Sequence, residues 1–197
     1  VRLLAQKLRH HSRFSHFLDD DKIIEILFKS APLHDIGKVG IPDNILLKPG
    51  RFEPEEFEIM KTHPALGRSA ILHAEYELGI EVPFLKYAKE IAYAHQEKWD
   101  GSGYPLGLAG DNIPISARLM AIADVYDALI SRRVYKEGMP HEKAVQIIVD
   151  GRGNHFDPDM VDAFLELQND FKAVAEKYAD SDEDLARKAE YLKNASK

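Results

Sequence analysis

Apolar residues recur at helical spacing along most of this chain, and that periodicity restricts the fold more than any other feature. In residues 23–31 and 114–130 the apolar side chains fall three and four positions apart, and no stretch shows the sustained alternation that is typical of strands. Asp20 or Asp21 can cap the first of these helices, and a proline opens the second. The sequence therefore predicts an all-α fold in the form of a helical bundle.

Two segments break this periodicity and are expected to be loops. Residues 38–52 contain two prolines and two glycines, and residues 99–112 contain four glycines. Between them, a helix is expected to begin near Pro54 and to continue past a kink at Pro64.

The length of 197 residues suits one substantial domain rather than two. We predict a domain over residues 1–170, with extra helices at its C-terminal end, followed by a charged helical tail over residues 171–197. The chain starts with Val1 inside an amphipathic helical pattern. Its first helix is therefore predicted to be truncated and to continue upstream.

Charge and composition exclude several classes of function. The 26 basic and 33 acidic residues leave a formal net charge of −7, which does not suit nonspecific binding of a nucleic-acid polymer. The absence of cysteine excludes disulfide scaffolds, zinc fingers, iron–sulfur clusters and thiol nucleophiles. Apolar runs are too short to span a bilayer, and no signal peptide opens the chain. We expect a cytoplasmic domain without a membrane segment.

Four features with metal-ligand chemistry lie at the ends or on the inner stripes of four predicted helices. They are the His34-Asp35 pair, His63, His95 and Asp124, separated by 29, 32 and 29 residues. Each separation equals about one helix and one loop, so an antiparallel bundle can bring all of them together. Adjacent side chains on a helix point about 100° apart. His34 and Asp35 are therefore expected to face a common ion without hydrogen-bonding each other.

Asp124 carries the most information of these residues, because a lone histidine on an apolar stripe is more often structural. It lies in the apolar segment RLMAIADVYDALI, where an unpartnered buried carboxylate would cost several kcal/mol. It must therefore be paired with a cation, a metal or a proton. A site of imidazole and carboxylate ligands suits iron, manganese, nickel or zinc.

Other catalytic motifs fail when they are compared with the sequence. The segment HQEKW from His95 lacks the second histidine of a zincin, and its H-x-E has no cysteines to complete a zinc deaminase. There is no Walker loop, no dinucleotide fingerprint after a strand and no G-x-S-x-G serine elbow. A His/Asp metal centre is the prediction that survives.

Five segments then appear in an order that resembles the HD-GYP family, metal-dependent phosphodiesterases of cyclic di-GMP within the HD phosphohydrolase superfamily. The similarity extends from about Ile23 to Phe164. It implies an HD-type helical bundle with a long GYP loop. The segments are LHDIGKVGIPDNILLKPG (33–50), MKTHPALG (60–67), HQEKWDGSGYPLGL (95–108), IPISARLMAIADVYDAL (113–129) and RVYK (133–136).

The resemblance implies a metal-binding role for five residues. His34, Asp35, His63, His95 and Asp124 match metal ligands of the family, and Asp35 matches the carboxylate that bridges two divalent ions. Iron or manganese is the expected metal, with nickel or zinc as alternatives.

The resemblance also implies a set of residues that meet the substrate. Lys38 matches a lysine that faces the scissile phosphate, so Asp35 and Lys38 are the predicted catalytic residues. Lys38, Arg133 and Lys136 are predicted to bind the phosphates, and Tyr104 in the GYP loop to wall the pocket.

The implied function is hydrolysis of cyclic di-GMP to linear pGpG and on to GMP, by the output domain of a bacterial two-component signalling protein. The implied partners are an upstream receiver or sensory domain, a diguanylate cyclase and a second copy of the chain. Two alternatives stay open. One is a catalytically degenerate cyclic di-GMP receptor or scaffold, and the other is an HD phosphohydrolase that acts on another cyclic dinucleotide.

Two departures from the family pattern bear on the metal site. The family often has two consecutive histidines where this chain has His95 and Gln96, and an amide oxygen is a poorer ligand than an imidazole. A histidine of the family's preceding helix would fall before Val1. We therefore predict a binuclear site in the full-length protein, weaker in this chain, with Gln96 beside it.

Overall fold

The computed structural model describes residues 1–80, 82–132, 138–179 and 181–195. Within these ranges the chain forms helices and turns, with two isolated β-bridges and no strand, so the all-α prediction is confirmed. The helices are α1 (Arg2–Leu8), α2 (Ser15–Leu18), α3 (Asp21–Ser30), α4 (Asp43–Leu46), α5 (Pro54–Met60), α6 (His63–Leu78), α7 (Pro83–Ala94), α8 (Ile115–Ile130), α9 (His141–Asp150), α10 (Pro158–Lys177) and α11 (Asp182–Ala195), with short 3₁₀ helices η1 (Ala31–Leu33), η2 (Ile36–Gly40) and η3 (Gly110–Asn112).

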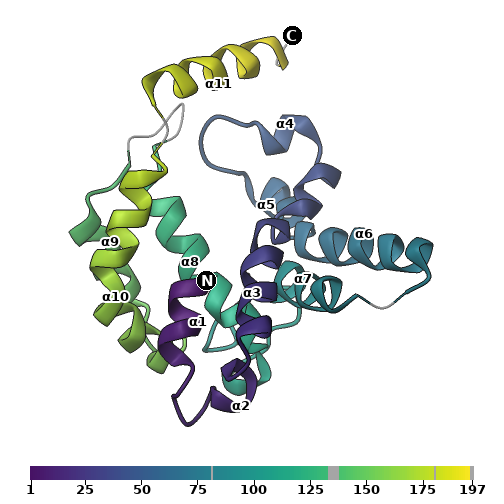
Figure 1. The fold of residues 1–197 in the computed structure, drawn as a ribbon. Coiled ribbons are helices and arrows are strands. Elements are labelled where there is room, and N and C mark those ends of the chain that lie inside the picture. The colour runs from purple at the N-terminus through teal and green to yellow at the C-terminus, as the bar shows by residue number, and fades with distance from the viewer. Residues whose placement is uncertain (81, 133–137, 180, 196–197) are drawn as a thin grey trace.

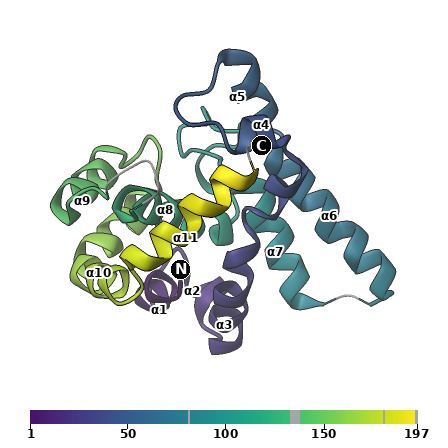
Figure 2. The same ribbon diagram turned by 90° about the horizontal axis from the view of Figure 1, so that it is seen from above.

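Helix α8 lies at the centre of the bundle. Every residue from Ser116 to Ile122 is buried, which requires neighbours on all sides of this part of the helix. Helices α1, α9 and α10 lie on one side of α8, and α7 with α3 on the other (Figures 1 and 2). Buried side chains from all of these helices form the main hydrophobic core, with Leu4, Ile91, Leu119, Ile148 and Phe164 among its fully buried members.

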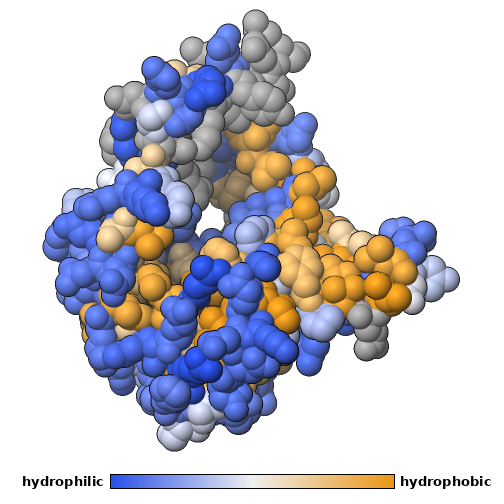
Figure 3. All heavy atoms as spheres, in the orientation of Figure 1, coloured by the Kyte–Doolittle hydropathy of each residue, from blue (hydrophilic) through white to orange (hydrophobic). Residues whose placement is uncertain are grey.

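Helices α6 and α7 form a hairpin that extends away from this core (Figure 1). Large apolar side chains are exposed on α6 and just beyond it, and they gather on this side of the molecule in Figure 3. Among the described residues, no helix combines the length and the hydrophobicity that crossing a bilayer requires.

The predicted kink at Pro64 is wrong, because the chain breaks into two helices just before this residue. Helix α5 ends at Met60, and Pro64 is in the first turn of α6. Proline is tolerated there because the first N–H groups of a helix have no partner within the helix. The break matters for function because it places His63 at the first position of a new helix.

The loop predictions hold with small additions. Residues 38–52 contain the last turn of η2 and the short α4, and residues 99–112 are irregular apart from η3. Asp20 caps α3 by accepting a hydrogen bond from the Lys22 N–H at 2.8 Å, as one of the two predicted caps. The predicted division at residue 170 falls within α10, and it stays a prediction.

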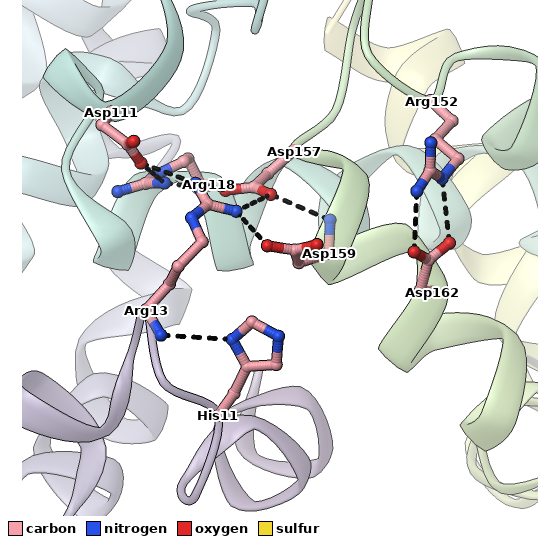
Figure 4. A network of polar contacts seen from close by, with 8 residues as sticks. All are labelled: His11, Arg13, Asp111, Arg118, Arg152, Asp157, Asp159 and Asp162. Carbon is pink, nitrogen blue, oxygen red and sulfur yellow. Dashed lines mark hydrogen bonds and ion pairs between the residues drawn. The ribbon is translucent and has the colours of Figure 1, made fainter.

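A network of arginine and aspartate side chains joins the N-terminal segment at Arg13 to the start of α10, which is distant in the sequence (Figure 4). The carboxylate of Asp157, fully buried at the start of α10, accepts hydrogen bonds from Arg118 on α8 at 2.7 Å and from Arg13 at 3.0 Å. Arg13 also pairs with Asp111 and Asp159. These contacts join four segments that are separated in the sequence, so the network stabilises their packing against one another.

Candidate metal centre

The HD pair lies in a turn between two 3₁₀ helices. His34 ends η1 and Asp35 begins η2, with backbone angles at Asp35 of φ −101° and ψ 9° that interrupt the helix. The imidazole Nε2 of His34 lies 3.3 Å from Oδ2 of Asp35. The two side chains thus lie within ion-pairing distance of each other, a closeness that the expectation of a continuous helix did not include.

Gly37 allows this turn to approach the start of α6. A Cβ atom at Gly37 would lie 1.9 Å from the carbonyl oxygen of His63 and 2.4 Å from the backbone nitrogen of Gly67. Both distances are far inside van der Waals contact, so only glycine fits. The close approach brings Asp35 next to His63, which is 28 residues away in the sequence.

Three imidazoles are oriented in the same way by backbone carbonyls. The Nδ1 atoms of His34 and His63 lie 2.8 Å from the carbonyl oxygens of Ala31 and Met60. Nδ1 of His95 lies 3.1 Å from the Ile91 oxygen, at the C-terminal end of α7. Each Nδ1–H therefore donates to a backbone carbonyl oxygen three or four residues earlier in the chain, near the end of a helix. This contact orients each ring so that its other nitrogen, Nε2, can face a metal.

The Nε2 atoms of His63 and His95 face each other at 3.3 Å in a buried position. Because both Nδ1 atoms carry the proton, two lone pairs point at the same space. Burial lowers the pKa of His63, which favours its neutral form. Facing lone pairs repel, and a cation between them would remove that repulsion.

Asp35 completes this group. Its Oδ1 lies 3.5 Å from Nε2 of His63 and 3.7 Å from Nε2 of His95. This oxygen is buried and has no hydrogen-bond partner in the described part of the chain. The three residues offer ligand atoms that all lie within 4.8 Å of one another. An orphaned carboxylate oxygen beside two imidazole lone pairs fits a divalent cation.

The second oxygen of Asp35 faces a different set of groups. Oδ2 lies 3.3 Å from Nε2 of His34 and 2.5 Å from Nζ of Lys38. His34 in turn lies 3.5 Å from Oδ1 of Asp124 on α8, a half-buried carboxylate. The two oxygens of Asp35 thus point towards His63 and His95 on one side and towards His34 and Lys38 on the other. A carboxylate placed in this way can bridge two ions.

Protonated His34 lies between Asp35 and Asp124 and offsets part of their negative charge. Burial would lower the pKa of His34, but Asp124 and Asp35 outweigh it and raise the pKa to about 10. Burial would likewise raise the pKa of both aspartates, yet His34 and its neighbours hold each pKa below its usual value. A cluster that requires this positive charge is suited to exchange the proton for a metal cation.

The structure describes two of the four predicted substrate-binding residues, Lys38 and Tyr104. Lys38 pairs with Asp35 at the edge of the cluster. The Tyr104 ring lies 6.4 Å from the His63 ring and is half-buried, and burial together with nearby Asp35 and Asp124 raises its pKa to about 12. Arg133 and Lys136 lie outside the described residues. The structure therefore brings together all five predicted ligands, with Lys38 and Tyr104 beside them.

Glu97 is a residue that the sequence reading missed. It was considered only as part of failed zinc motifs, yet it is 2% exposed and its carboxylate accepts hydrogen bonds from the backbone of the GYP loop. One signal could have revealed it. An acidic residue directly before a glycine-rich loop is well placed to accept that loop's free N–H groups.

Comparisons with known proteins identify the family of the chain. A protein-family model described as an HD domain matches residues 13–160 of this chain. The chain is 57% identical over 182 residues to a probable cyclic di-GMP phosphodiesterase of Vibrio cholerae, covering 92% of this chain and 41% of that protein. It is 43% identical over 150 residues to a 3'3'-cGAMP-specific phosphodiesterase of the same organism, covering 76% of this chain and 28% of that one.

The chain thus spans less than half the length of these curated relatives. Among solved structures, it is similar to an HDG"Y"P protein from Bdellovibrio bacteriovorus, with a TM-score of 0.57 and 22% identity over 85% of this chain and 51% of that chain. At this identity the likeness concerns the fold alone. The matched model, the sequence relatives and the ordered motifs together establish that the chain belongs to the HD domain family, within its HD-GYP group.

Proposed function

We propose that this chain is the catalytic domain of a metal-dependent phosphodiesterase that hydrolyses cyclic di-GMP. The observation that carries the proposal is the convergence of His63 Nε2, His95 Nε2 and an unpartnered Asp35 oxygen on one buried point, with Lys38 beside it. Water cleaves one phosphodiester of the ring to give linear pGpG, and a second water cleaves pGpG to two GMP. Relatives bearing this activity in their names support the choice of substrate.

The centre is proposed to hold two divalent cations, iron or manganese in the first place and nickel or zinc as alternatives. His34, Asp35, His63, His95 and Asp124 would hold them, with Asp35 as the bridge. Bound cations of this kind lower the pKa of water and neutralise phosphoryl oxygens. The mixture of imidazoles and carboxylates suits these metals better than a soft metal.

The chain's own residues supply binding and charge. Asp35 holds Lys38 at the edge of the cluster, where the ammonium group can stabilise the negative charge that develops on the phosphoryl oxygens. Tyr104 is protonated at neutral pH, since an unperturbed tyrosine titrates near 10 and burial raises the pKa of this one to about 12, so its hydroxyl can donate a hydrogen bond to a base of the nucleotide. Arg133 and Lys136 are proposed to hold the phosphates.

Two other functions remain as candidates with distinct supporting observations. A second cyclic dinucleotide is favoured as an alternative substrate by the relative named for 3'3'-cGAMP. A catalytically degenerate receptor is kept as a candidate because Gln96 replaces the second histidine of the family motif. We further propose a cytoplasmic location, an upstream receiver or sensory domain, contact with a diguanylate cyclase, and a homodimer.

The proposal is tested by replacing Asp35 with alanine in the full-length protein. This change removes ligands for both ions, so we expect turnover of cyclic di-GMP to fall by more than about 10³-fold and bound metal to decrease. Turnover and metal content are measured in parallel, with Asp43→Ala on α4 as the control for losing an exposed aspartate of the neighbouring segment. Retained turnover in metal-depleted Asp35→Ala protein would refute the function.

A further inference from the structure

The GYP loop, residues 99–112, folds back on itself shortly after α7, and His95 lies at the C-terminal end of that helix. The Gly110 N–H donates to the Trp99 carbonyl at 2.9 Å, and Asp100 and Ala109 form an isolated antiparallel β-bridge. These contacts hold the two ends of the loop side by side. Between these ends lie Tyr104 and several glycines. Leu108 packs against a small apolar cluster and the Tyr104 ring lies 6.3 Å from that of Phe57, and polar contacts inside the loop add to these in fixing where Tyr104 lies.

The side chain of Glu97 provides such contacts from inside the loop. Its Oε1 accepts the N–H of Leu106 at 2.7 Å, and its Oε2 accepts the N–H of Leu108 at 3.0 Å. Glu97 is among the fully buried side chains, whereas Leu106 is 55% exposed. The exposed part of the loop is therefore held by hydrogen bonds to a buried carboxylate, which are stronger than bonds between neutral groups.

The other side of the loop contacts the backbone of Glu97. A Cβ atom at Gly103 would lie 2.5 Å from the Glu97 Cα and 2.3 Å from the backbone nitrogen of Lys98. The loop thus passes over the main chain of Glu97 at Gly103 and receives its carboxylate at Leu106 and Leu108. Tyr104 lies between these points of attachment, and its N–H donates to the Gln96 carbonyl at 3.2 Å.

We propose that Glu97 is a positioning residue for substrate specificity. It fixes the GYP loop so that the Tyr104 ring stands beside the His63 ring, 6.4 Å away, where it can contact a nucleotide. Glu97 acts through the loop and touches neither the metal ligands' side chains nor the reacting phosphate. The inference rests on the proposed function, because it assigns a role in recognising the cyclic dinucleotide.

The test compares Glu97→Gln with Glu90→Gln in the full-length protein. The amide at position 97 keeps one acceptor but directs an NH₂ group at an N–H, so one of the two loop contacts is lost. Glu90 lies on α7 and accepts a hydrogen bond from the Ser116 hydroxyl at 2.9 Å, so its variant controls for losing one negative charge near the same helix.

We expect Glu97→Gln to lower kcat/KM for cyclic di-GMP by about 10- to 100-fold, mainly by raising KM. Turnover of bis(p-nitrophenyl) phosphate, which lacks nucleotide bases, should stay within about twofold of wild type, and metal content should not change. Tyr104→Ala combined with Glu97→Gln should cost little more than the larger single change, because both act at one place. Glu90→Gln should leave both substrates unaffected.

Hydrogen exchange separates this inference from the proposed function. Exchange of the Leu106 and Leu108 amides should be faster in Glu97→Gln than in wild type, whether or not cyclic di-GMP is the substrate. Unchanged exchange would overturn the inference, as would equal losses with both substrates or a loss of metal. Wild-type protein that does not hydrolyse cyclic di-GMP would refute the proposed function instead.

Discussion

At the scale of single residues, the first prediction concerns Lys38, which we propose faces the scissile phosphate. Its ammonium group is 2.5 Å from Asp35 and partly exposed, so it can also reach a bound phosphate. We expect Lys38→Ala to lower kcat/KM by 10- to 100-fold, since a hydrogen bond to a charged group contributes about 1.5–3 kcal/mol. The control is Lys48→Ala, which removes a lysine paired with Glu56, and steady-state kinetics with cyclic di-GMP is the measurement. Equal kinetics in both variants would place the phosphate elsewhere.

The raised pKa of His34 predicts that metal binding releases a proton. Its pKa of about 10 in the metal-free protein lies above the ordinary value of 6.5, so the protonated form is stabilised by folding. This contribution to stability is complete below about pH 6.5 and is lost as the pH rises through about 10. A metal must displace the proton, so binding at pH 7–9 should release about one proton and strengthen about tenfold per pH unit.

Calorimetry measures this proton release. Titration of manganese into metal-free protein, in HEPES and in Tris buffer, gives different apparent enthalpies if protons are released to the buffer, because the two buffers differ in their heats of protonation. The difference should vanish in His34→Gln, which cannot carry the proton. Identical enthalpies in the two buffers for the wild-type protein would contradict the prediction.

At the scale of helices, the carboxylate of Asp157 does more than cap α10. It is completely buried and is hydrogen-bonded to Arg118, whose own side chain is only 6% exposed. Asp157→Ala leaves that guanidinium buried beside one fewer carboxylate, which typically costs about 3–5 kcal/mol. We expect the free energy of unfolding to fall by this amount, measured by urea denaturation followed by circular dichroism.

The matched control is drawn in the same view (Figure 4). Arg152 and Asp162 also form a two-contact pair, at 2.8 and 2.9 Å, but both side chains are about half exposed. Asp162→Ala should therefore cost less than about 1 kcal/mol. A similar loss in the two variants would mean that burial does not set the strength of this network.

At the scale of the whole molecule, the prediction concerns metal stoichiometry. Five ligands with a bridging Asp35 are enough for two ions when water fills the remaining positions, and too few for three. We expect two metals per full-length protein and partial occupancy in this 197-residue chain, measured by elemental analysis after equilibration with metal. Gln96 should then lie beside the site and orient water or substrate. Three fully occupied metals, or Gln96 directed into solvent, would contradict this view.

The residue types and their spacing were sufficient to predict the helical class and to single out five candidate ligands that the structure brings together. Helical periodicity is a local property, so it can be read without knowledge of long-range contacts. Asp124 was recognisable because a carboxylate in an apolar helix needs a partner wherever that helix packs. For these residues the structure adds distances to an expectation that local chemistry already supplied.

Packing between distant segments decided the rest. The contact between His34 and Asp35 depends on a helix break, and the approach of Asp35 to His63 depends on Gly37 lying against the α6 backbone. The role of Glu97 depends on how the following loop closes around it. These features arise from which backbone groups meet across long sequence separations, and hydrogen bonds of that kind leave no periodic trace in the sequence. The residue types of the candidate site could therefore be predicted from the sequence, whereas the orientation of their side chains and the contacts that support them were decided by the tertiary structure.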